Sequence, residues 1–423
     1  MKRMFFHHPN IILYVREAMF ERKRNKPPIQ HMIRLLTIIG ARPQIIKAAA
    51  ISRAISMHFA DKIEEYILHT GQHYDQNMSA VFFDELGIPE PHYNLHVGSG
   101  SHAQQTARIT EGVEQVLLSA KEQATPFDGI IVYGDTNSTL AAAIAAAKIH
   151  VPVFHIEAGL RSFNMSMPEE INRIVCDQLS SILFTPTQTG LSNLRQEGFA
   201  DDGIKQHVRF ANGKNQEVVL SGDVMYDNSL YFSQIADQKS DIIERLGLQP
   251  RAFVLATIHR PANTDNAENL QSIFAALLNI AEQEHIDIVL PLHPRTRKML
   301  NTQLTPELLE RINHTNRLKI IPPASFFEII RLEKNARVVM TDSGGVQKEA
   351  FFFETPCVIL RPETEWVEIV EAGAGVIADA DYQRIMNAYH QLAGKAVNFP
   401  PLFGDGHASE KILTEIINYF ASL

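Results

Sequence analysis

Short runs of consecutive apolar residues alternate along the chain with longer segments whose apolar residues recur at helical spacing. Uninterrupted Val, Ile and Leu runs are typical of strands buried on both faces of a parallel sheet, and the segments between them have the length of connecting helices. In the first half of the chain, strands are predicted at 35–39, 65–70, 129–133, 151–156 and 182–185. The pattern weakens at 200–230 and then restarts, with strands predicted at 253–257, 287–291, 318–321, 338–341 and 357–360.

The two sets of strands predict an α/β fold with two Rossmann-like domains that face a cleft. The first domain is expected at 32–220 and the second at 221–404, followed at 405–423 by a helix that could pack back on the first domain. Residues 1–31 precede the first clean strand pattern and are interpreted as an N-terminal extension, either an added arm or a misassigned start. This segment is a poor signal peptide, because no small-residue cleavage site follows its apolar runs.

Composition and charge exclude several classes of partner. The formal net charge of −9 leaves no basic excess for a phosphate backbone, so no nucleic acid is expected. No apolar run approaches the ~18 residues that span a bilayer, so no membrane partner is expected. Cys176 and Cys357 lie outside any Cys/His metal pattern and are interpreted as buried thiols, which suits a cytoplasmic location.

Ionisable residues concentrate directly after the predicted strands. Because parallel strands end at the same edge of a sheet, where α/β proteins bind ligands, these residues are expected to lie together in the cleft. The segments are G-A-R-P-Q-I-I-K at 40–47, G-D-T-N-S-T at 134–139, H-I-E-A-G-L-R-S-F-N-M-S-M-P-E-E at 155–170, I-H-R-P-A-N at 258–263, L-H-P-R-T-R at 292–297, T-D-S-G-G-V-Q-K-E at 341–349 and R-P-E-T-E-W at 361–366.

The segment T-D-S-G-G-V-Q-K-E has the features of a phosphate site. Ser343, Gly344 and Gly345 open a predicted helix directly after a strand, where backbone N–H groups and the helix dipole favour an anion such as a diphosphate. The alternative is a tight strand-to-helix turn with a serine cap. Glu349, one turn into the helix, could accept hydrogen bonds from ribose hydroxyls or could be a solvated helix residue.

Three carboxylates and a histidine are candidates for acid and base chemistry: Asp135, Glu157, Glu169 and His259. Each has a structural alternative. Asp135 could be an N-cap, Glu157 could pair with Arg161, Glu169 could stabilise a helix start, and His259 could be a core histidine. All of them follow predicted strands beside the candidate phosphate site, which favours a shared functional role.

Two further segments are weaker signals. In G-A-R-P-Q-I-I-K, Arg42 and Lys47 could bring positive charge towards the cleft or could be ordinary surface residues. The segment G-S-G-S-H-A at 98–103 matches the loose dinucleotide fingerprint, but that fingerprint belongs in the first strand-helix unit of a domain. It is therefore interpreted as a loop beside the cleft, and nicotinamide binding is not expected.

Taken in order, these motifs resemble those of the non-hydrolysing UDP-N-acetylglucosamine 2-epimerases, and the resemblance spans most of the chain from residue 32 onward. It implies a glycosyltransferase-B type fold with UDP bound by the second domain, usually a homodimer, and a role in surface polysaccharide biosynthesis such as that of lipopolysaccharide. The residues that match the family's functional positions are Asp135, Glu157, Glu169 and His259 for catalysis, and Arg42, Lys47, Ser343, Gly344, Gly345, Glu349, Arg361 and Glu365 for the substrate.

The chemistry of this family explains why such groups are needed. The C2 hydrogen of the sugar has no adjacent carbonyl, so the family is understood to eliminate UDP across C1–C2 and to add it back to a 2-acetamidoglucal. This reaction needs a base, an acid on the opposite face and stabilisation of the departing diphosphate. His259 could assist the leaving phosphate oxygen. No metal and no other cofactor is expected, and the sequence does not assign a carboxylate to either face.

Two departures bear on the substrate and on regulation. Many bacterial members have an arginine where this chain has Trp366, and a Gln-His-Arg-Glu-like loop, linked to allosteric activation by substrate, where it has G-Q-H-Y-D at 71–75. Together with P-L-H-P-R-T-R at 291–297, these features look like the branch that epimerises UDP-2,3-diacetamido-2,3-dideoxy-glucuronate. In that case Arg161, Arg295 or Arg297 could meet the extra carboxylate of the substrate, and His293 is a further candidate contact with the UDP sugar.

Three alternatives remain open at this point. A glycosyltransferase shares the fold and the phosphate-binding logic but would not exchange the C2 hydrogen. A hydrolysing 2-epimerase would release free sugar and UDP. A sugar-nucleotide sensor would bind UDP without turnover.

Overall fold

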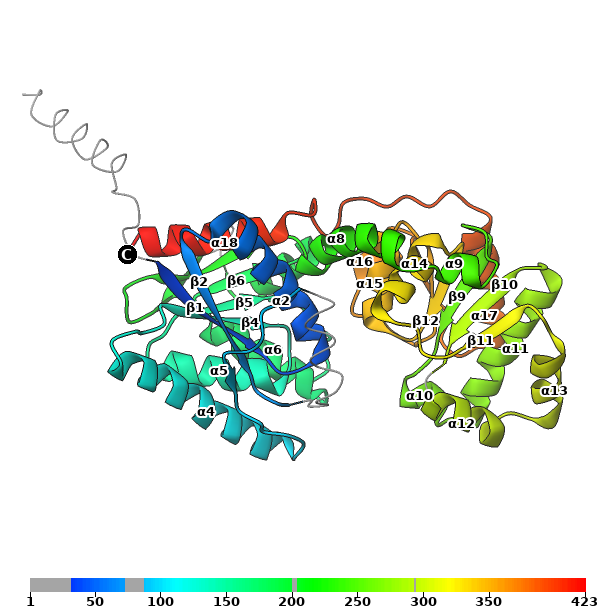
Figure 1. Cartoon of the computed structure of the whole chain (residues 1–423), viewed down its shortest axis with the longest axis horizontal. Coiled ribbons are helices and arrows are strands. Elements are labelled where there is room, and N and C mark those ends of the chain that lie inside the picture. Colours follow the sequence, from blue (N-terminus) through cyan, green and yellow to red (C-terminus); the bar gives the residue numbers. More distant parts are fainter. Residues whose placement is uncertain (1–31, 73–86, 200–203, 293) are drawn as a thin grey trace, which may run out of the picture.

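The computed structural model describes residues 32–72, 87–199, 204–292 and 294–423. It contains two sheets, each covered by helices, in two units that lie side by side along the long axis of the molecule (Figure 1). The predicted α/β fold with two Rossmann-like units is therefore confirmed. The N-terminal extension at 1–31 lies outside the described residues. No helix of the described ranges is both long and apolar enough to cross a membrane.

The first sheet has eight strands in the order β3-β2-β1-β4-β5-β6-β8-β7. Its pairings are parallel except that of β7 with β8, which is antiparallel. The strands are β1 (Ile33–Ile39), β2 (Ile63–His69), β3 (Tyr93–Asn94), β4 (Gly129–Tyr133), β5 (Val153–Ile156), β6 (Ile182–Thr185), β7 (Ile204–Arg209) and β8 (Asn215–Leu220). The helices of this unit are α2 (Arg42–Ala54), which continues into the π-helical segment η1 (Ile55–Phe59), α4 (His102–Glu122), α5 (Asn137–Lys148), α6 (Pro168–Leu179) and α7 (Gln188–Gln196).

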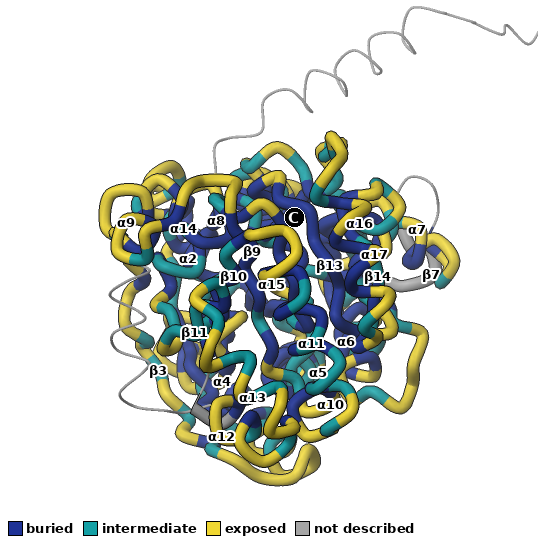
Figure 2. The backbone as a smooth tube through the Cα atoms, turned by 90° about the vertical axis from the view of Figure 1, so that its right-hand side faces the viewer, coloured by how far each residue is buried: buried dark blue, intermediate teal, exposed yellow. Residues whose placement is uncertain are grey.

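The second sheet has six strands in the order β11-β10-β9-β12-β13-β14, all parallel. They are β9 (Phe253–Thr257), β10 (Asp287–Pro291), β11 (Leu318–Ile321), β12 (Val338–Thr341), β13 (Cys357–Ile359) and β14 (Gly375–Ile377). In Figure 2, β9 and β13 are largely buried, whereas most of the edge strand β11 is of intermediate burial. The helices are α9 (Ile242–Arg245), α10 (Pro261–Thr264), α11 (Ala267–Gln283), α12 (Pro294–Gln303), α13 (Pro306–His314), α14 (Phe326–Asn335), α15 (Gly344–Phe352), α16 (Val367–Glu371) and α17 (Tyr382–Ala393).

The long helix α8 (Val224–Lys239) joins the units, and the last helix, α18 (Ala408–Ala421), returns to the first unit. Helix α8 packs against α2 of the first unit and against α14 and α15 of the second. After the second sheet the chain returns, and α18 lies on α2 and α8, over the first unit (Figure 1). The side chains Ile412, Leu413 and Ile416 of α18 are fully buried in the first unit's core.

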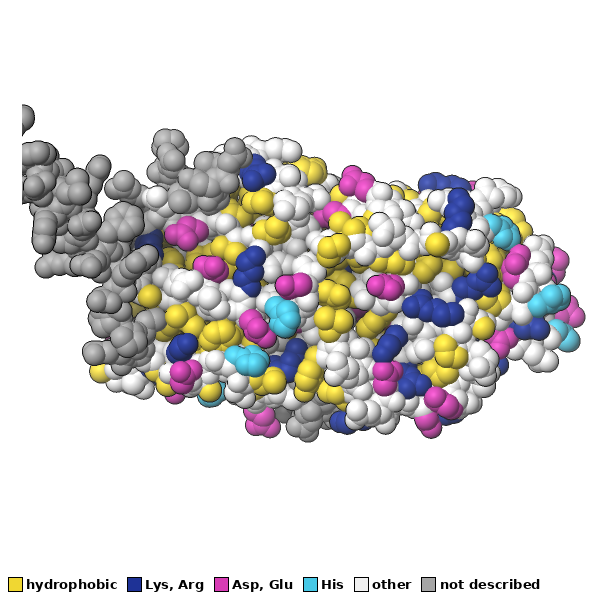
Figure 3. Space-filling view, turned by 90° about the horizontal axis from the view of Figure 1, so that it is seen from above, with side chains coloured by type: hydrophobic (Ala, Val, Ile, Leu, Met, Phe, Trp, Pro, Cys, Tyr) yellow, Lys and Arg dark blue, Asp and Glu magenta, His cyan; other side chains and the backbone are white. Residues whose placement is uncertain are grey.

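The two chain crossings between the units meet at one point. The backbone N–H of Asp223, just before α8, donates to the carbonyl of Phe403 at 2.9 Å. Gly222 has φ +84°, and a Cβ placed on it would lie 3.0 Å from that same carbonyl oxygen, so only glycine suits this contact. Acidic and basic side chains are interspersed on the face above these crossings (Figure 3).

Candidate active site

The candidate site lies where β1, β4 and β5 of the first sheet and β12 and β13 of the second end and the two units approach one another. Its first-unit side is centred on Glu157, directly after β5, with φ +69°, a conformation uncommon for a residue with a side chain. This backbone turn opens the segment between β5 and α6, which is buried at 158–161 and exposed at 163–166. The site therefore rests on irregular backbone at a strand end, as functional sites often do.

Glu157 is held by lysines from both units. Its Oε2 atom lies 2.7 Å from Nζ of Lys47, on α2, and 3.6 Å from Nζ of Lys348, on α15. Burial raises the pKa of Glu157, but Lys47 and then Lys348 outweigh this effect and lower the pKa to about 2. The alternative that Glu157 pairs with Arg161 is wrong, because the carboxylate is matched to the two lysines.

Asp135, directly after β4, shows the opposite behaviour. Its Oδ2 accepts a hydrogen bond from Nη2 of Arg173 at 2.6 Å, yet burial raises its pKa, and Arg173 and Lys47 offset only part of that effect. The nearby charge of Glu157 raises the pKa of Asp135 further. One carboxylate is thus held as an anion while its neighbour is biased towards accepting a proton, a division of roles that is typical of acid/base sites.

The two glutamates at the start of α6 have different environments. Glu169 is exposed in the first turn of the helix. Glu170 is buried, and its carboxylate accepts hydrogen bonds from the backbone N–H groups of Ser162 and Phe163 and from Nη1 of Arg173 at 2.7–2.9 Å. Glu170 therefore fixes the loop between β5 and α6, a role that goes beyond that of a helix-start acid, and leaves Glu169 accessible.

Arg161 is engaged inside the first unit. Its guanidinium donates to Asp177 Oδ2 at 2.7 Å, to the Glu197 carboxylate at 2.6 and 2.9 Å, and to the carbonyl of Leu160. Asp177 also contacts Nδ1 of His155 at 2.7 Å, and Nε2 of His155 contacts the carbonyl of Gly134 at 2.8 Å. In this arrangement Arg161 supports the loop between β5 and α6. To contact the substrate as predicted, Arg161 would have to give up some of its hydrogen bonds to Asp177, Glu197 and Leu160.

The second-unit side of the site is the N-terminus of α15. Ser343 is its N-cap and accepts a hydrogen bond from the N–H of Val346. Beside it, Arg361 and Glu365 form an ion pair of 2.9 Å, and a Cβ placed on Gly344 would lie 3.3 Å from Oε2 of Glu365. Gly344 and Gly345 lie in the first turn of the helix, whose unpaired N–H groups and dipole favour an anion.

Two acids complete this side. Asp342 is fully buried and accepts hydrogen bonds from the backbone N–H groups of His259 and Arg260, while its Oδ1 lies 3.1 Å from Nδ1 of His259. The ring of His259 is 55% exposed and is thus oriented by a buried carboxylate while remaining accessible. Burial raises the pKa of Glu349 to about 7, with Lys348 and Arg42 opposing that effect, so Arg42 is also close to this site.

Two predicted substrate contacts are not tested. His293 lies outside the described residues, and Arg295 is the second residue of α12, but its side chain is not described. Arg297 is exposed on the same helix. The segment G-Q-H-Y-D extends beyond the described residues after Gln72.

The sequence reasoning did not single out several residues that the fold brings into the site. Lys348 and Asp342 lie in T-D-S-G-G-V-Q-K-E, where the sequence pattern indicates a role for the serine and the glycines but not for these two residues. Arg173 lies in P-E-E-I-N-R, one helical turn after Glu170, and this spacing could have indicated an ion pair. Asp223 carries no local signal, because its importance comes from contacts distant in sequence.

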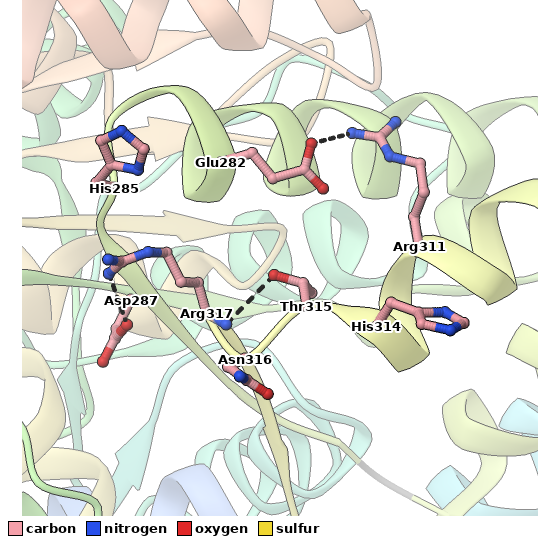
Figure 4. A pocket seen from close by; sticks show the side chains of 8 residues that line it. All are labelled: Glu282, His285, Asp287, Arg311, His314, Thr315, Asn316 and Arg317. Atoms are coloured by element: carbon pink, nitrogen blue, oxygen red, sulfur yellow. Dashed lines mark hydrogen bonds and ion pairs between the residues drawn. The ribbon is translucent and has the colours of Figure 1, made fainter.

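A surface hollow also lies away from the candidate active site, at the far edge of the second sheet. It encloses about 700 Å³ and its charged side chains are largely paired with one another (Figure 4). Arg311 donates to Glu282 at 2.7 Å, and Arg317 lies 3.4 Å from Asp287. This open, internally neutralised surface offers no counterpart to the acid and base groups between the units.

Comparison with known proteins agrees with this geometry. A family model described as UDP-N-acetylglucosamine 2-epimerase matches residues 56–417. The chain is 45% identical over 381 residues, 90% of its length and 98% of the relative's, to a UDP-2,3-diacetamido-2,3-dideoxy-D-glucuronate 2-epimerase of Pseudomonas aeruginosa. It is 43% identical over 91% of its length, and all of the relative's, to a UDP-N-acetylglucosamine 2-epimerase homolog of Methanococcus maripaludis.

A solved structure is also similar. It is the UDP-GlcNAc 2-epimerase of Methanocaldococcus jannaschii in complex with UDP-GlcNAc and UDP, with a TM-score of 0.75 and 37% identity over 92% of this chain and 100% of that one.

Proposed function

Because the chain belongs to the UDP-N-acetylglucosamine 2-epimerase family, an isomerase family, we propose that it inverts C2 of a UDP-2-acetamido sugar by elimination and re-addition of UDP. The observation that carries this proposal is the pair of carboxylates at the ends of β4 and β5. Burial raises the pKa of Asp135, whereas the lysines lower the pKa of Glu157, and Glu157 also contacts Lys348 of α15, the helix whose N-terminus suits a diphosphate.

In the elimination step, a carboxylate removes the proton from C2, the C1–C2 double bond forms, and the C1–O bond breaks with its electron pair leaving on UDP. In the return step, a proton is delivered to the other face of C2 and a diphosphate oxygen re-forms the bond to C1. Asp135, whose pKa is raised by burial, and Glu169, which is exposed at the start of α6, are the candidates for the two faces.

The remaining groups serve the charge that develops during the reaction. Glu157 stays ionised between its lysines and can stabilise positive charge on the sugar ring as the C1–O bond breaks. The N–H groups of Gly344 and Gly345, with Ser343 and Arg361, would hold the diphosphate. His259, oriented by Asp342, can hydrogen-bond to the leaving oxygen, and Glu349 would accept hydrogen bonds from the ribose.

We further propose that the substrate is the 2,3-diacetamido-glucuronate analogue, which would be converted to the mannuronate epimer. The relative that is 45% identical is named for this sugar, and Trp366 replaces the arginine of many UDP-N-acetylglucosamine epimerases. Turnover of this UDP sugar and of UDP-N-acetylglucosamine should be compared side by side by NMR. Reaction of UDP-N-acetylglucosamine alone would contradict the assignment.

A cytoplasmic location and a role in polysaccharide biosynthesis are also proposed. The two free cysteines are buried, as expected for a cytoplasmic enzyme of polysaccharide biosynthesis. A homodimer is proposed from the family resemblance, and light scattering of the purified chain tests it.

A further inference from the structure

Lys348 contacts Glu157 in the proposed chemistry, but its closer contact with Asp223 and its contact with Trp366 have no part in that chemistry. It lies on α15, whose N-terminus is the proposed diphosphate site, and its side chain is 4% exposed. Its ammonium group lies 2.6 Å from Oδ2 of Asp223, 3.6 Å from Oε2 of Glu157 and 4.2 Å from the centre of the Trp366 ring. A buried cation with two carboxylates and one aromatic face is fully surrounded, so its position is well determined.

These contacts join the two units and the crossing between them. Glu157 belongs to the first unit, and Lys348 and Trp366 belong to the second. Asp223 is fixed where the crossings meet, because its N–H donates to the carbonyl of Phe403 and its Oδ1 accepts from the N–H of Met225 at 2.8 Å. The lysine therefore reaches from the second unit to the acid of the first unit while anchored by Asp223 where the two chain crossings meet.

We propose that Lys348 is a positioning residue, which holds the Glu157 carboxylate from the second unit and couples it through Asp223 to the point where the two chain crossings meet. This inference rests on the proposed function, in which Glu157 acts as an anion. It also gives Trp366 a role, because the indole ring covers the ammonium group that an arginine at this position would repel. A movement of the second unit that lengthens the distance between Lys348 and Glu157 would weaken the positive charge that Glu157 experiences.

The charged groups around Lys348 and Glu157 decide whether loss of the Lys348 charge raises or lowers the pKa of Glu157. Glu157 faces Lys47 from α2, Lys348 from α15 and Arg173 from α6, with the acid Asp135 nearby. Lys348 faces Asp223, Glu157 and the acid Glu349 of its own helix. Burial raises the pKa of Glu157, and Lys348 is one of the cations that lower it. Loss of the Lys348 charge therefore raises the pKa of Glu157.

The test is a set of variants of the full chain, with the pKa of Glu157 read by NMR of carboxyl-labelled glutamate and assigned with E157Q. Lys348→Met is expected to raise the pKa of Glu157 by about one unit or more. It should lower kcat at least about tenfold, with KM for the UDP sugar changed less than about threefold. Lys348→Arg, which keeps the positive charge, should retain much of the wild-type kcat and much of the lowering of the Glu157 pKa. Lys334→Met is the matched control, because Lys334 pairs with Asp237 at 2.6 Å on the outside of α14.

Because Lys348→Met leaves Asp223 buried without its partner, the double variant Lys348→Met with Asp223→Asn removes both charges and is tested in parallel. An unchanged pKa of Glu157 in either variant overturns the inference. So does a tenfold rise of KM with kcat unchanged, which would make Lys348 a direct substrate contact. If the wild-type chain turns over no UDP sugar, the proposed function fails, whereas the NMR titration still decides whether Lys348 sets the ionisation of Glu157.

Discussion

The ammonium group of Lys47 lies 2.7 Å from the carboxylate of Glu157, and this contact joins the first helix of the fold to the end of its fifth strand. Both side chains are largely buried, so the pair is a strong local electrostatic feature. The positive charge of Lys47 therefore favours the ionised form of Glu157.

Replacing Lys47 with methionine should weaken both stability and turnover. The pKa of Glu157 is lowered to about 2 in the folded state, so its ionisation stabilises the fold above the ordinary pKa of 4.5, and this contribution is lost as the pH falls through the folded value. Lys47→Met should therefore reduce the free energy of unfolding at pH 7 by roughly 1–3 kcal/mol and by less at pH 4. Urea unfolding at the two pH values measures this, and an equal loss at both would contradict it.

Replacing Asp135 with asparagine should abolish most of the activity. The amide is nearly isosteric and keeps an oxygen for Arg173, but it cannot exchange a proton. We expect kcat to fall by about 100-fold to 10,000-fold with little change in the binding of UDP. Steady-state kinetics with UDP-binding calorimetry measures this, and full activity of the variant would remove Asp135 from the acid/base roles.

Neighbouring glutamates of α6 offer a matched comparison. Glu169→Gln should lower kcat by about 100-fold and leave stability within about 0.5 kcal/mol, because the side chain is exposed. Glu170→Gln should lose stability by roughly 1–3 kcal/mol, since its carboxylate accepts bonds from Ser162, Phe163 and Arg173. Kinetics and thermal unfolding of both variants test the distinction. The reverse pattern, with Glu169→Gln fully active, would transfer the functional role to Glu170.

Gly344→Ala should weaken UDP binding. The added Cβ would lie 3.3 Å from Oε2 of Glu365 and next to the N–H groups proposed to hold the diphosphate. We expect Kd for UDP to rise by about tenfold, a loss of about 1.4 kcal/mol. Gly394→Ala at the end of α17 is the control, because its added Cβ meets no atom closer than 3.7 Å. Equal affinity of the two variants for UDP would place the diphosphate elsewhere.

The sequence predicted the sheets and the strand ends well, because buried parallel strands have continuous apolar runs and their ligand residues follow them directly. It missed β3, β7 and β14, which lie at the edges of the sheets, and β8, whose first three residues are polar. It also could not find the partners of Glu157. Lys47 and Lys348 come from helices about 110 and 190 residues away, and their meeting depends on how the two units pack.

The difference between Glu169 and Glu170 was equally hidden. Both follow Pro168 at a helix start, and the local pattern favours acids at each position. Only the fold shows that the loop from Ser162 folds over Glu170, so that one side chain is buried and the other exposed. Adjacent helix positions differ by about 100° in direction, and the sequence does not state which of them faces the loop.

The central claim is that UDP departs and returns while C2 loses and regains its proton. It is tested most directly by incubating the protein with each candidate UDP sugar in deuterated water and following the C1 and C2 positions by NMR. The account predicts an equilibrium mixture of two intact UDP sugars, epimeric at C2 and carrying deuterium there. Accumulation of free sugar and UDP, or transfer of the sugar with its C2 hydrogen retained, would contradict it.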